Sequence, residues 1–174
     1  MSLSNRVMYH TQERRNIRLK APVVCEREDA WLGDGYYFWD DVVDAEQWGH
    51  NSKRETGYFE VYKAEILIDN FLDTVFNEAH YRFWISQVEK AAEQIRRKTG
   101  LKPTIKEVNE YFKERAIWSE VDGIIFQDIP EKDNILKVKA FYYRKRIQAA
   151  VYNLEIITTF AFHSESRCKT KKWY

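Results

Sequence analysis

The sequence predicts an α+β fold, because strand-like and helix-like segments are segregated along the chain rather than strictly alternating. Strand patterns gather in residues 6–68 and again in residues 121–162, whereas residues 70–116 between them have helical periodicity. A hydrophobic fraction of 44% in 174 residues is enough to form a core. We therefore expect one domain over residues 1–174, with a helical segment at about 70–116 that forms a central layer or an insertion.

The N-terminal part begins with a short mixed segment, residues 6–10, that predicts a first strand. Residues 11–30 are charged and irregular, which favours a loop or a short helix. Further along, residues 51–55 predict a loop, and residues 57–68 are rich in Tyr, Phe, Val and Ile, which predicts a strand.

Residues 33–49 are the most informative part of the chain and predict a turn, a strand and a helix. Gly33 and Gly35 allow a tight turn with positive φ. Four aromatic residues at 36–39 then predict a short strand, and the two Asp residues at 40–41 offer an N-cap for a helix. Such a unit holds several aromatic faces around one small volume, which suits a flat heteroaromatic ligand.

The central segment predicts two or more helices. Residues 70–98 carry a helical apolar pattern that bends or breaks where one stripe gives way to another. The two stripes are Leu72, Val75, Phe76, Ala79 and Phe83, and then Trp84, Val88, Ala91 and Ile95. Residues 99–103 end this pattern, and Thr104 with Glu107 fits a capping box for a following helix. That helix would bury Ile105, Val108 and Phe112.

The C-terminal part predicts strands separated by polar loops. The expected strands are residues 121–126, 138–143, 147–152 and 156–162, with a polar loop at 130–134 and a mobile tail at 169–174.

Composition excludes several classes of protein. The 28 basic and 27 acidic residues give a formal net charge of +1, so there is no strong signal for nucleic-acid binding. Cys25 and Cys168 are too far apart in sequence to suggest a disulfide framework. No apolar run reaches the roughly 18 residues of a membrane span, and no secretory segment is present. We therefore expect a cytoplasmic protein that has no membrane partner.

The common catalytic motifs are absent. The four histidines, His10, His50, His80 and His163, are scattered, and there is no pair of metal-ligand spacing, so we predict no metal site. There is no phosphate-binding loop, no Rossmann glycine pattern and no nucleophile elbow. The many carboxylates are best interpreted as solvated helix faces, which disfavours the common hydrolases.

Three short motifs remain, in a fixed order. They are Tyr9-His10-Thr11, then Gly33-Asp34-Gly35-Tyr36-Tyr37-Phe38 with Ala45 and Trp48, and finally Gln148-Ala-Ala-Val-Tyr-Asn153. Their order resembles the ADP-ribosyltransferase fold, in the branch whose triad is His, Tyr and Glu. Poly(ADP-ribose) polymerases and bacterial or phage relatives form that branch. The resemblance covers about residues 5–50 and 120–163, and it implies a split mixed β-sheet with a central helical layer or insertion.

The resemblance implies a binding site for NAD as substrate. His10 matches the histidine of the first motif and would hold a hydroxyl of the adenosine ribose. Thr11 stands where the family has a glycine whose backbone binds the nicotinamide amide. In the middle motif Gly35 and Tyr36 would be further cofactor-binding residues, and Tyr37 takes the place of the motif tyrosine.

The second stacking ring and the third motif complete the implied site. Trp48 falls where the family has a ring that stacks on nicotinamide, so the base would lie between Tyr37 and Trp48. Gln148 best matches the third position, where chain-elongating members have Glu, and it would bond to the nicotinamide ribose and orient the acceptor. Glu155 is the alternative carboxylate if the register differs.

These expectations lead to one main functional prediction and two alternatives. The first is an NAD-dependent mono-ADP-ribosyltransferase that transfers ADP-ribose to an unknown macromolecular acceptor, as a toxin or effector with a neutralising partner protein would. His10, Tyr37 and Gln148 would be its catalytic residues. The second is a catalytically inactive binding module on the same scaffold, which Thr11 and Gln148 favour. The third is a different α+β fold whose aromatic residues only form the core.

Overall fold

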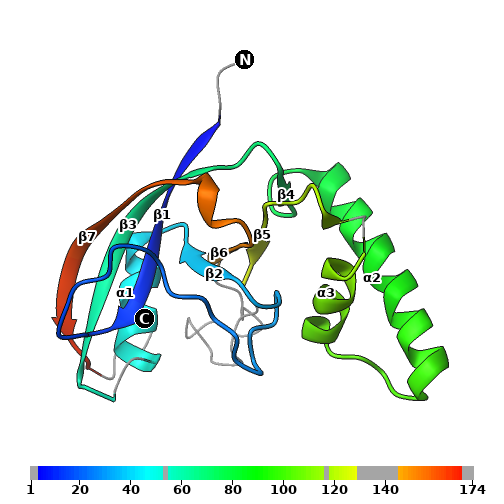
Figure 1. Cartoon of the computed structure of the whole chain (residues 1–174), viewed down its shortest axis with the longest axis horizontal. Helices are drawn as coiled ribbons and strands as arrows, with labels where there is room; N and C mark the ends of the chain where they lie inside the picture. Colours follow the sequence, from blue (N-terminus) through cyan, green and yellow to red (C-terminus); the bar gives the residue numbers. More distant parts are fainter. Residues whose placement is uncertain (1–3, 53–54, 116–117, 129–144, 170–174) are drawn as a thin grey trace, which may run out of the picture.

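The computed structural model describes residues 4–52, 55–115, 118–128 and 145–169. In these residues seven strands form one sheet in the order β4-β5-β6-β2-β1-β3-β7 (Figure 1). The pairing of β4 with β5 is parallel and the other pairings are antiparallel. The fold is therefore α+β, as the segregation of the sequence patterns predicted, and its sheet is mixed.

The helices and strands have the following bounds. The strands are β1 (Asn5–Glu13), β2 (Tyr36–Trp39), β3 (Tyr58–Leu67), β4 (Phe71–Asp73), β5 (Gly123–Gln127), β6 (Ile147–Val151) and β7 (Ile157–Arg167). The helices are α1 (Val42–Ser52), α2 (Glu78–Thr99) and α3 (Ile105–Lys113), with a short 3-10 helix at Leu154–Ile156.

Most predicted strands are confirmed. Those expected at 6–10, 36–39, 57–68 and 147–152 correspond to β1, β2, β3 and β6, and those at 121–126 and 156–162 correspond to β5 and β7. The first strand is longer than predicted, because Thr11, Gln12 and Glu13 continue its ladder with β3. The predicted strand at 138–143, the loop at 130–134 and the end of the tail lie outside the described residues.

The prediction of helix throughout 70–98 is wrong at its start. Phe71–Asp73 forms strand β4, which pairs with β5, and α2 begins only after Asn77, whose side chain accepts a bond of 3.2 Å from the His80 N–H. The first apolar stripe, from Leu72 to Phe83, therefore does not form one buried helix face. Phe76 and Phe83 in it are exposed. The prediction that the second stripe is a buried face of a helix is confirmed, since Trp84 and Ala91 on α2 are buried.

The capping box predicted for α3 is confirmed. The Glu107 N–H donates to Thr104 Oγ1 at 3.2 Å, and the Thr104 N–H donates to Glu107 Oε2 at 2.6 Å. Bonding to the Thr104 backbone and hydroxyl lowers the pKa of the Glu107 carboxyl. Val108 and Phe112 are buried against α2 and the sheet. The cap therefore fixes the start of a helix whose apolar face packs in the core.

The helices divide the sheet into two halves. Helix α1 packs on β1 and β3, whereas α2 and α3 pack together at the other end of the molecule beside β4 (Figure 1). Among the described residues, β1 and β2 pair at one register position, Tyr9 opposite Trp39. Because β1 pairs with β3 at nine positions, this sparse pairing marks the place where the two halves of the sheet separate.

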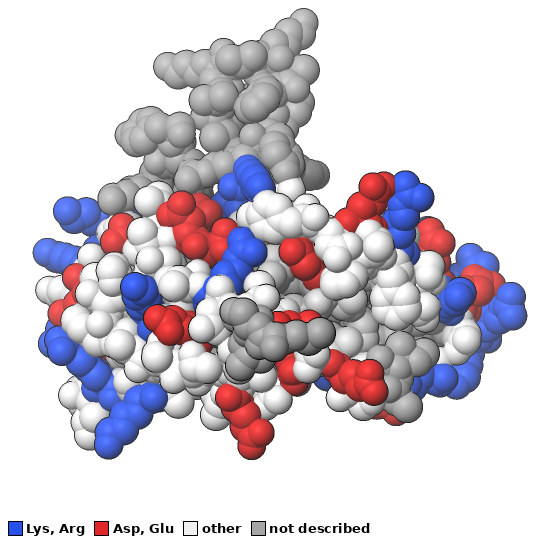
Figure 2. Space-filling model, turned by 90° about the horizontal axis from the view of Figure 1, so that it is seen from above, with Lys and Arg blue, Asp and Glu red and all other residues white. Residues whose placement is uncertain are grey.

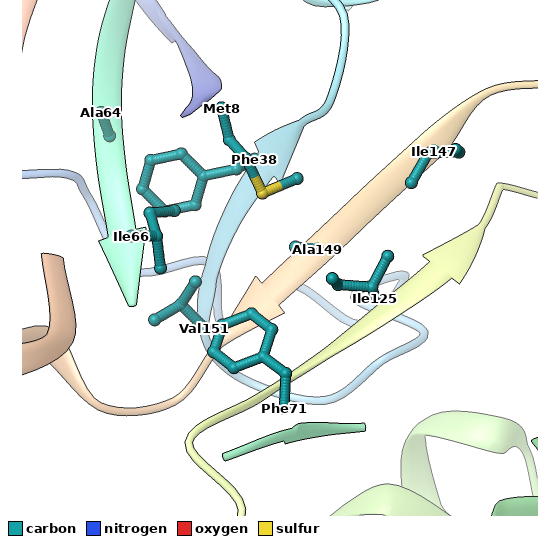
Figure 3. Packing of buried hydrophobic residues seen from close by; sticks show 9 residues of the cluster. All are labelled: Met8, Phe38, Ala64, Ile66, Phe71, Ile125, Ile147, Ala149 and Val151. Atoms are coloured by element: carbon teal, nitrogen blue, oxygen red, sulfur yellow. The ribbon is translucent and has the colours of Figure 1, made fainter. Parts of the chain in front are cut away.

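One core cluster nevertheless runs through both halves. Met8 and Phe38 come from β1 and β2, and Ala64 and Ile66 from β3, while Phe71, Ile125, Ile147, Ala149 and Val151 come from β4, β5 and β6 (Figure 3). All nine are at most 6% exposed. Burial of apolar side chains from six strands fixes the two halves relative to each other on this side of the sheet.

The close packing of α1 against the sheet requires a glycine at position 49. A Cβ added to Gly49 would overlap the ring of Phe59, which is fully buried in β3. Gly to Ala inside a helix normally stabilises by up to about 1 kcal/mol. Here we expect Gly49→Ala to lower the free energy of unfolding by about 1–3 kcal/mol, because the overlap must push α1 away. Urea denaturation measures the change.

A matched control for this substitution is Glu46→Ala in the same helix, where the half-exposed side chain leaves room. It should change the free energy of unfolding by less than about 0.5 kcal/mol. A Gly49→Ala protein that is more stable than the wild type would show that α1 does not sit on Phe59.

Candidate functional site

A cavity of about 340 Å³ opens where β1 and β2 separate. Its walls come from β1, β2, α1 and β6, from the end of β5, and from the loop between β1 and β2. The lining residues include His10, Thr11, Tyr37, Trp48 and Gln148. All five were selected from the sequence as site residues, and they come from four separate elements.

The sheet order explains why these residues meet. Strands β6, β2 and β1 are neighbours, although β6 is more than 100 residues from β2 in sequence. In the β2–β6 ladder Trp39 lies opposite Gln148 and Tyr37 opposite Ala150, so Tyr37, Trp39 and Gln148 share one face of the sheet. Trp48 reaches the same volume from α1.

His10 joins the two strands where their backbones part. The imidazole Nδ1 lies 2.8 Å from the Tyr37 carbonyl oxygen, and the Val23 N–H donates to Nε2 at 3.4 Å. These partners assign the proton to Nδ1, which donates to Tyr37. The side chain is 5% exposed and packs on the Phe38 ring. His10 therefore has a structural role as a bridge between β1 and β2.

Tyr37 is fixed by its hydroxyl. Its O–H donates to the Gly33 carbonyl at 2.8 Å and accepts from the Leu32 N–H at 3.0 Å. Burial raises the pKa of the Tyr37 phenol far above its ordinary value, the Leu32 N–H opposing this shift. The phenol is thus neutral and occupied, so it is the ring face, and not the hydroxyl, that Tyr37 can offer to a ligand.

The glycine turn before Tyr37 is held by helix α3. Gly33 has a φ of 85°, as the sequence predicted for this turn, whereas Gly35 is extended enough to form a bridge with Cys25. The Asp34 N–H donates to Glu110 Oε1 at 2.8 Å, and Lys113 Nζ donates to the Asp34 carbonyl. The central helical segment thereby positions the aromatic motif.

Thr11 fastens α1 to β1. Its hydroxyl donates to the Ala45 carbonyl at 2.7 Å, and the side chain is buried. A glycine at this position could not make that bond. Thr11 therefore has a packing role that a glycine could not fill, and it lines the cavity while its hydroxyl is directed to α1.

Trp48 is half-buried and lines the cavity, but its ring neighbour is Trp39. The two indole centroids are 5.7 Å apart with their planes at 46°. Sequence reasoning placed a base between Tyr37 and Trp48 and did not select Trp39. The signal for Trp39 was present, because residues two apart on a strand face the same side, so Trp39 had to accompany Tyr37.

Gln148 carries an unsatisfied polar atom. The residue is 6% exposed, and its Oε1 has no hydrogen-bond partner among the described residues. A buried amide oxygen without a partner is costly, typically about 1–3 kcal/mol, and such groups are rare in native proteins. Glu155, the alternative third-motif residue, is exposed in the 3-10 helix and is not among the lining residues, so the geometry favours Gln148.

Two further predicted residues do not line the cavity. Gly35 packs against β6, where an added Cβ would lie 2.9 Å from the Val151 carbonyl oxygen, so its small size serves the sheet. Tyr36 packs against the core cluster of Figure 3, on the opposite face from Tyr37. The expectation that Gly35 and Tyr36 bind the cofactor therefore has no support in the geometry.

Other lining residues were missed because they lie outside the motifs. They are Trp31 and the loop residues Val23 to Ala30 apart from Glu28, together with Gln12, Trp39 and Asp128. Cys25 is one of them, and neither Cys25 nor Cys168 forms a disulfide within the described residues. No sequence signal singles out Asp128, which follows β5 and pairs with Arg146 just before β6.

The surface charge agrees with the balanced composition. Basic and acidic side chains are interspersed over the face shown in Figure 2, without a large area of one sign. In the described residues, no group of three or more His, Cys, Asp or Glu is arranged to hold a metal ion. None of the helices in the described part of the chain has both the length and the apolar character that crossing a bilayer needs.

Comparisons with known proteins add no relative. A scan against models of protein families, a search of curated proteins and a search of solved structures each found no match to this chain. The geometry of the cavity must therefore carry the functional argument.

The hydroxyl of Tyr37 should be needed for stability. Tyr37→Phe leaves the Leu32 N–H and the Gly33 carbonyl without their partner. We expect the free energy of unfolding to fall by about 1–3 kcal/mol, the cost of unsatisfied buried groups. Urea denaturation measures it, with Tyr81→Phe, at an exposed tyrosine of α2, as the matched control. Equal stability of the two variants would contradict the described fixing of the turn.

Proposed function

We propose that the protein is an NAD-dependent mono-ADP-ribosyltransferase that uses the cavity between β1 and β2. The observation that carries the proposal is that His10, Tyr37, Trp48 and Gln148 line one cavity. They were selected from three short motifs that span most of the chain. Motifs that resemble a family only by chance have no reason to converge on one volume.

The aromatic wall supports a cationic, flat ligand. Trp48 is half-buried, so one part of its ring stays accessible, and Tyr37 and Trp39 line the same cavity. The nicotinamide ring of NAD⁺ carries a positive charge, which aromatic faces attract by about 1–2 kcal/mol when water is excluded. Breaking the glycosidic bond neutralises that ring, so this attraction serves binding and weakens as nicotinamide leaves.

Gln148 supplies the polar counterpart. Its Oε1, which has no partner among the described residues, is a hydrogen-bond acceptor, and a hydroxyl of the nicotinamide ribose is a suitable donor. Fixing that ribose would orient the carbon at which the glycosidic bond breaks through an oxocarbenium-like state. Gln148 does not titrate, so it positions the substrate and does not take up a proton.

His10 would bind a ribose hydroxyl only after a small change. Its Nδ1 is committed to the Tyr37 carbonyl, and Nε2 accepts the long bond from the Val23 N–H. A ligand hydroxyl that donates to Nε2 would replace Val23, which belongs to the loop over the cavity. Binding of NAD would therefore shift this loop.

A second candidate is a catalytically inactive binding module with the same cavity. The absence of a carboxylate at position 148 is the observation that favours it. In that case NAD or a partner would bind without release of nicotinamide.

One experiment separates these candidates. The protein is titrated with NAD⁺ up to millimolar concentration in a thermal-shift assay, and lysate is treated with the protein and a tagged NAD⁺. A raised melting temperature with labelling of lysate components supports the transferase, whereas a raised melting temperature alone supports the binding module. The absence of both a shift and labelling would contradict the transferase and a binding module for NAD, and would leave a module that binds only a partner.

Removing the accessible ring should weaken NAD⁺ binding. We expect Trp48→Ala to raise the dissociation constant for NAD⁺ about 5–30-fold, which corresponds to the loss of about 1–2 kcal/mol of cation–π attraction. Isothermal titration calorimetry measures it. Phe76→Ala removes an exposed ring that does not line the cavity, and it should leave the constant unchanged. If the two variants bind NAD⁺ equally well, Trp48 does not contact the base.

Gln148→Met should change stability and activity in opposite directions. Methionine has a similar shape and carries no unsatisfied amide, so we expect the free energy of unfolding to rise by about 1 kcal/mol. Loss of the acceptor for the ribose should slow nicotinamide release about 10-fold. Urea denaturation and a nicotinamide assay give the two values, and an unchanged rate would remove Gln148 from the site.

A further inference from the structure

Asp128 brings a carboxylate into the cavity beside Gln148. It directly follows β5, and its N–H donates to the Arg146 carbonyl at 2.8 Å, which continues the β5–β6 ladder. Two residues further along β6 lies Gln148. The Asp128 side chain is 14% exposed and pairs with the Arg146 guanidinium, yet it contributes to the cavity wall. A nearly buried carboxylate thus lies at the same edge as the proposed ribose contact.

The other groups in the cavity are poorly suited to accept a proton. Both nitrogens of His10 are engaged by backbone groups, and the Tyr37 phenol is neutral and donates its proton to a carbonyl. The remaining lining carboxylates, Glu26 and Asp29, are exposed on the loop, and Asp29 pairs with Arg27. Asp128 is therefore the carboxylate that is held by the sheet itself.

We propose that Asp128 is a catalytic residue, the general base that accepts the proton of the attacking acceptor. This assignment rests on the proposed transferase function. It supplies a general base, which the amide of Gln148 cannot be. The glycosidic bond of NAD⁺ breaks, and its electron pair leaves with nicotinamide as the neutral pyridine. The acceptor oxygen or nitrogen bonds to the ribose carbon, and its proton passes to Asp128, which later releases the proton to water.

Arg146 positions this carboxylate. Its guanidinium pairs with Asp128 and lies over the ring of Trp39, with the central carbon 5.5 Å from the centroid. One arginine thus connects the base to the aromatic wall. Arg146 is 12% exposed, so removing Asp128 alone would leave a nearly buried guanidinium without this partner.

The test compares two acceptors that differ in their need for a base. Water must lose a proton when it attacks, whereas azide is already an anion and needs no base. Nicotinamide release from NAD⁺ is measured with water alone and with added azide, for the wild type and Asp128→Asn. We expect the variant to lose about 100-fold in the water reaction, within the range of general-base catalysis, while the azide reaction stays within about threefold.

Two further variants complete the design. Asp128→Asn with Arg146→Gln removes both members of the ion pair, so it keeps the test valid if the single variant does not fold. Asp69→Asn makes the same chemical change at a residue that does not line the cavity, and it should behave as the wild type. The dissociation constant for NAD⁺ is measured for each variant and should change less than threefold.

The outcomes distinguish the inference from the function on which it rests. Loss of the water reaction with the azide reaction preserved supports Asp128 as the base. Retention of the water reaction in Asp128→Asn, or an equal loss with water and azide in both Asp128 variants, overturns that role while the transferase function stands. Absence of nicotinamide release from the wild type with either acceptor overturns the base and the enzymatic function together.

Discussion

The structure depends on how β1 and β2 separate. These central strands share one pairing, Tyr9 with Trp39, and beyond it the imidazole of His10 bonds to the Tyr37 carbonyl in place of a backbone N–H. A backbone carbonyl at this depth needs a donor, and a side chain that supplies one lets the strands diverge without an unsatisfied group. The same divergence opens the cavity. The hydrogen bond from His10 to the Tyr37 carbonyl therefore both connects the two strands and leaves space for a ligand between them.

The cavity is held open by elements on both sides of this divergence. On one side Thr11 ties α1 to β1, which fixes Trp48. On the other side α3 holds the glycine turn through Glu110 and Lys113, which fixes Tyr37. The central helices therefore serve the site indirectly: they contribute none of the lining residues in the described part of the chain, yet they determine where the aromatic motif lies.

The sequence predicted local elements well and non-local ones less well. Strand patterns and the capping box depend on neighbours in sequence, so β3 and the start of α3 could be found. Strand β4 has three residues and depends on its pairing with β5, which no local pattern reveals. Likewise Asp128 and Arg146 are 18 residues apart, and their ion pair exists only because β5 and β6 are neighbours. Tyr37, Trp48 and Gln148, which were selected from short motifs, line one cavity, and their roles toward a ligand stay a prediction.

The central claim is that the space between β1 and β2 binds the nicotinamide half of NAD⁺. A crystal of the protein soaked with NAD⁺ or a nicotinamide analogue tests it most directly. The account predicts electron density for the pyridine ring against Trp48, with a ribose hydroxyl within hydrogen-bonding distance of Gln148 Oε1. Density for the ring elsewhere on the molecule, or an empty cavity at millimolar ligand, would contradict it.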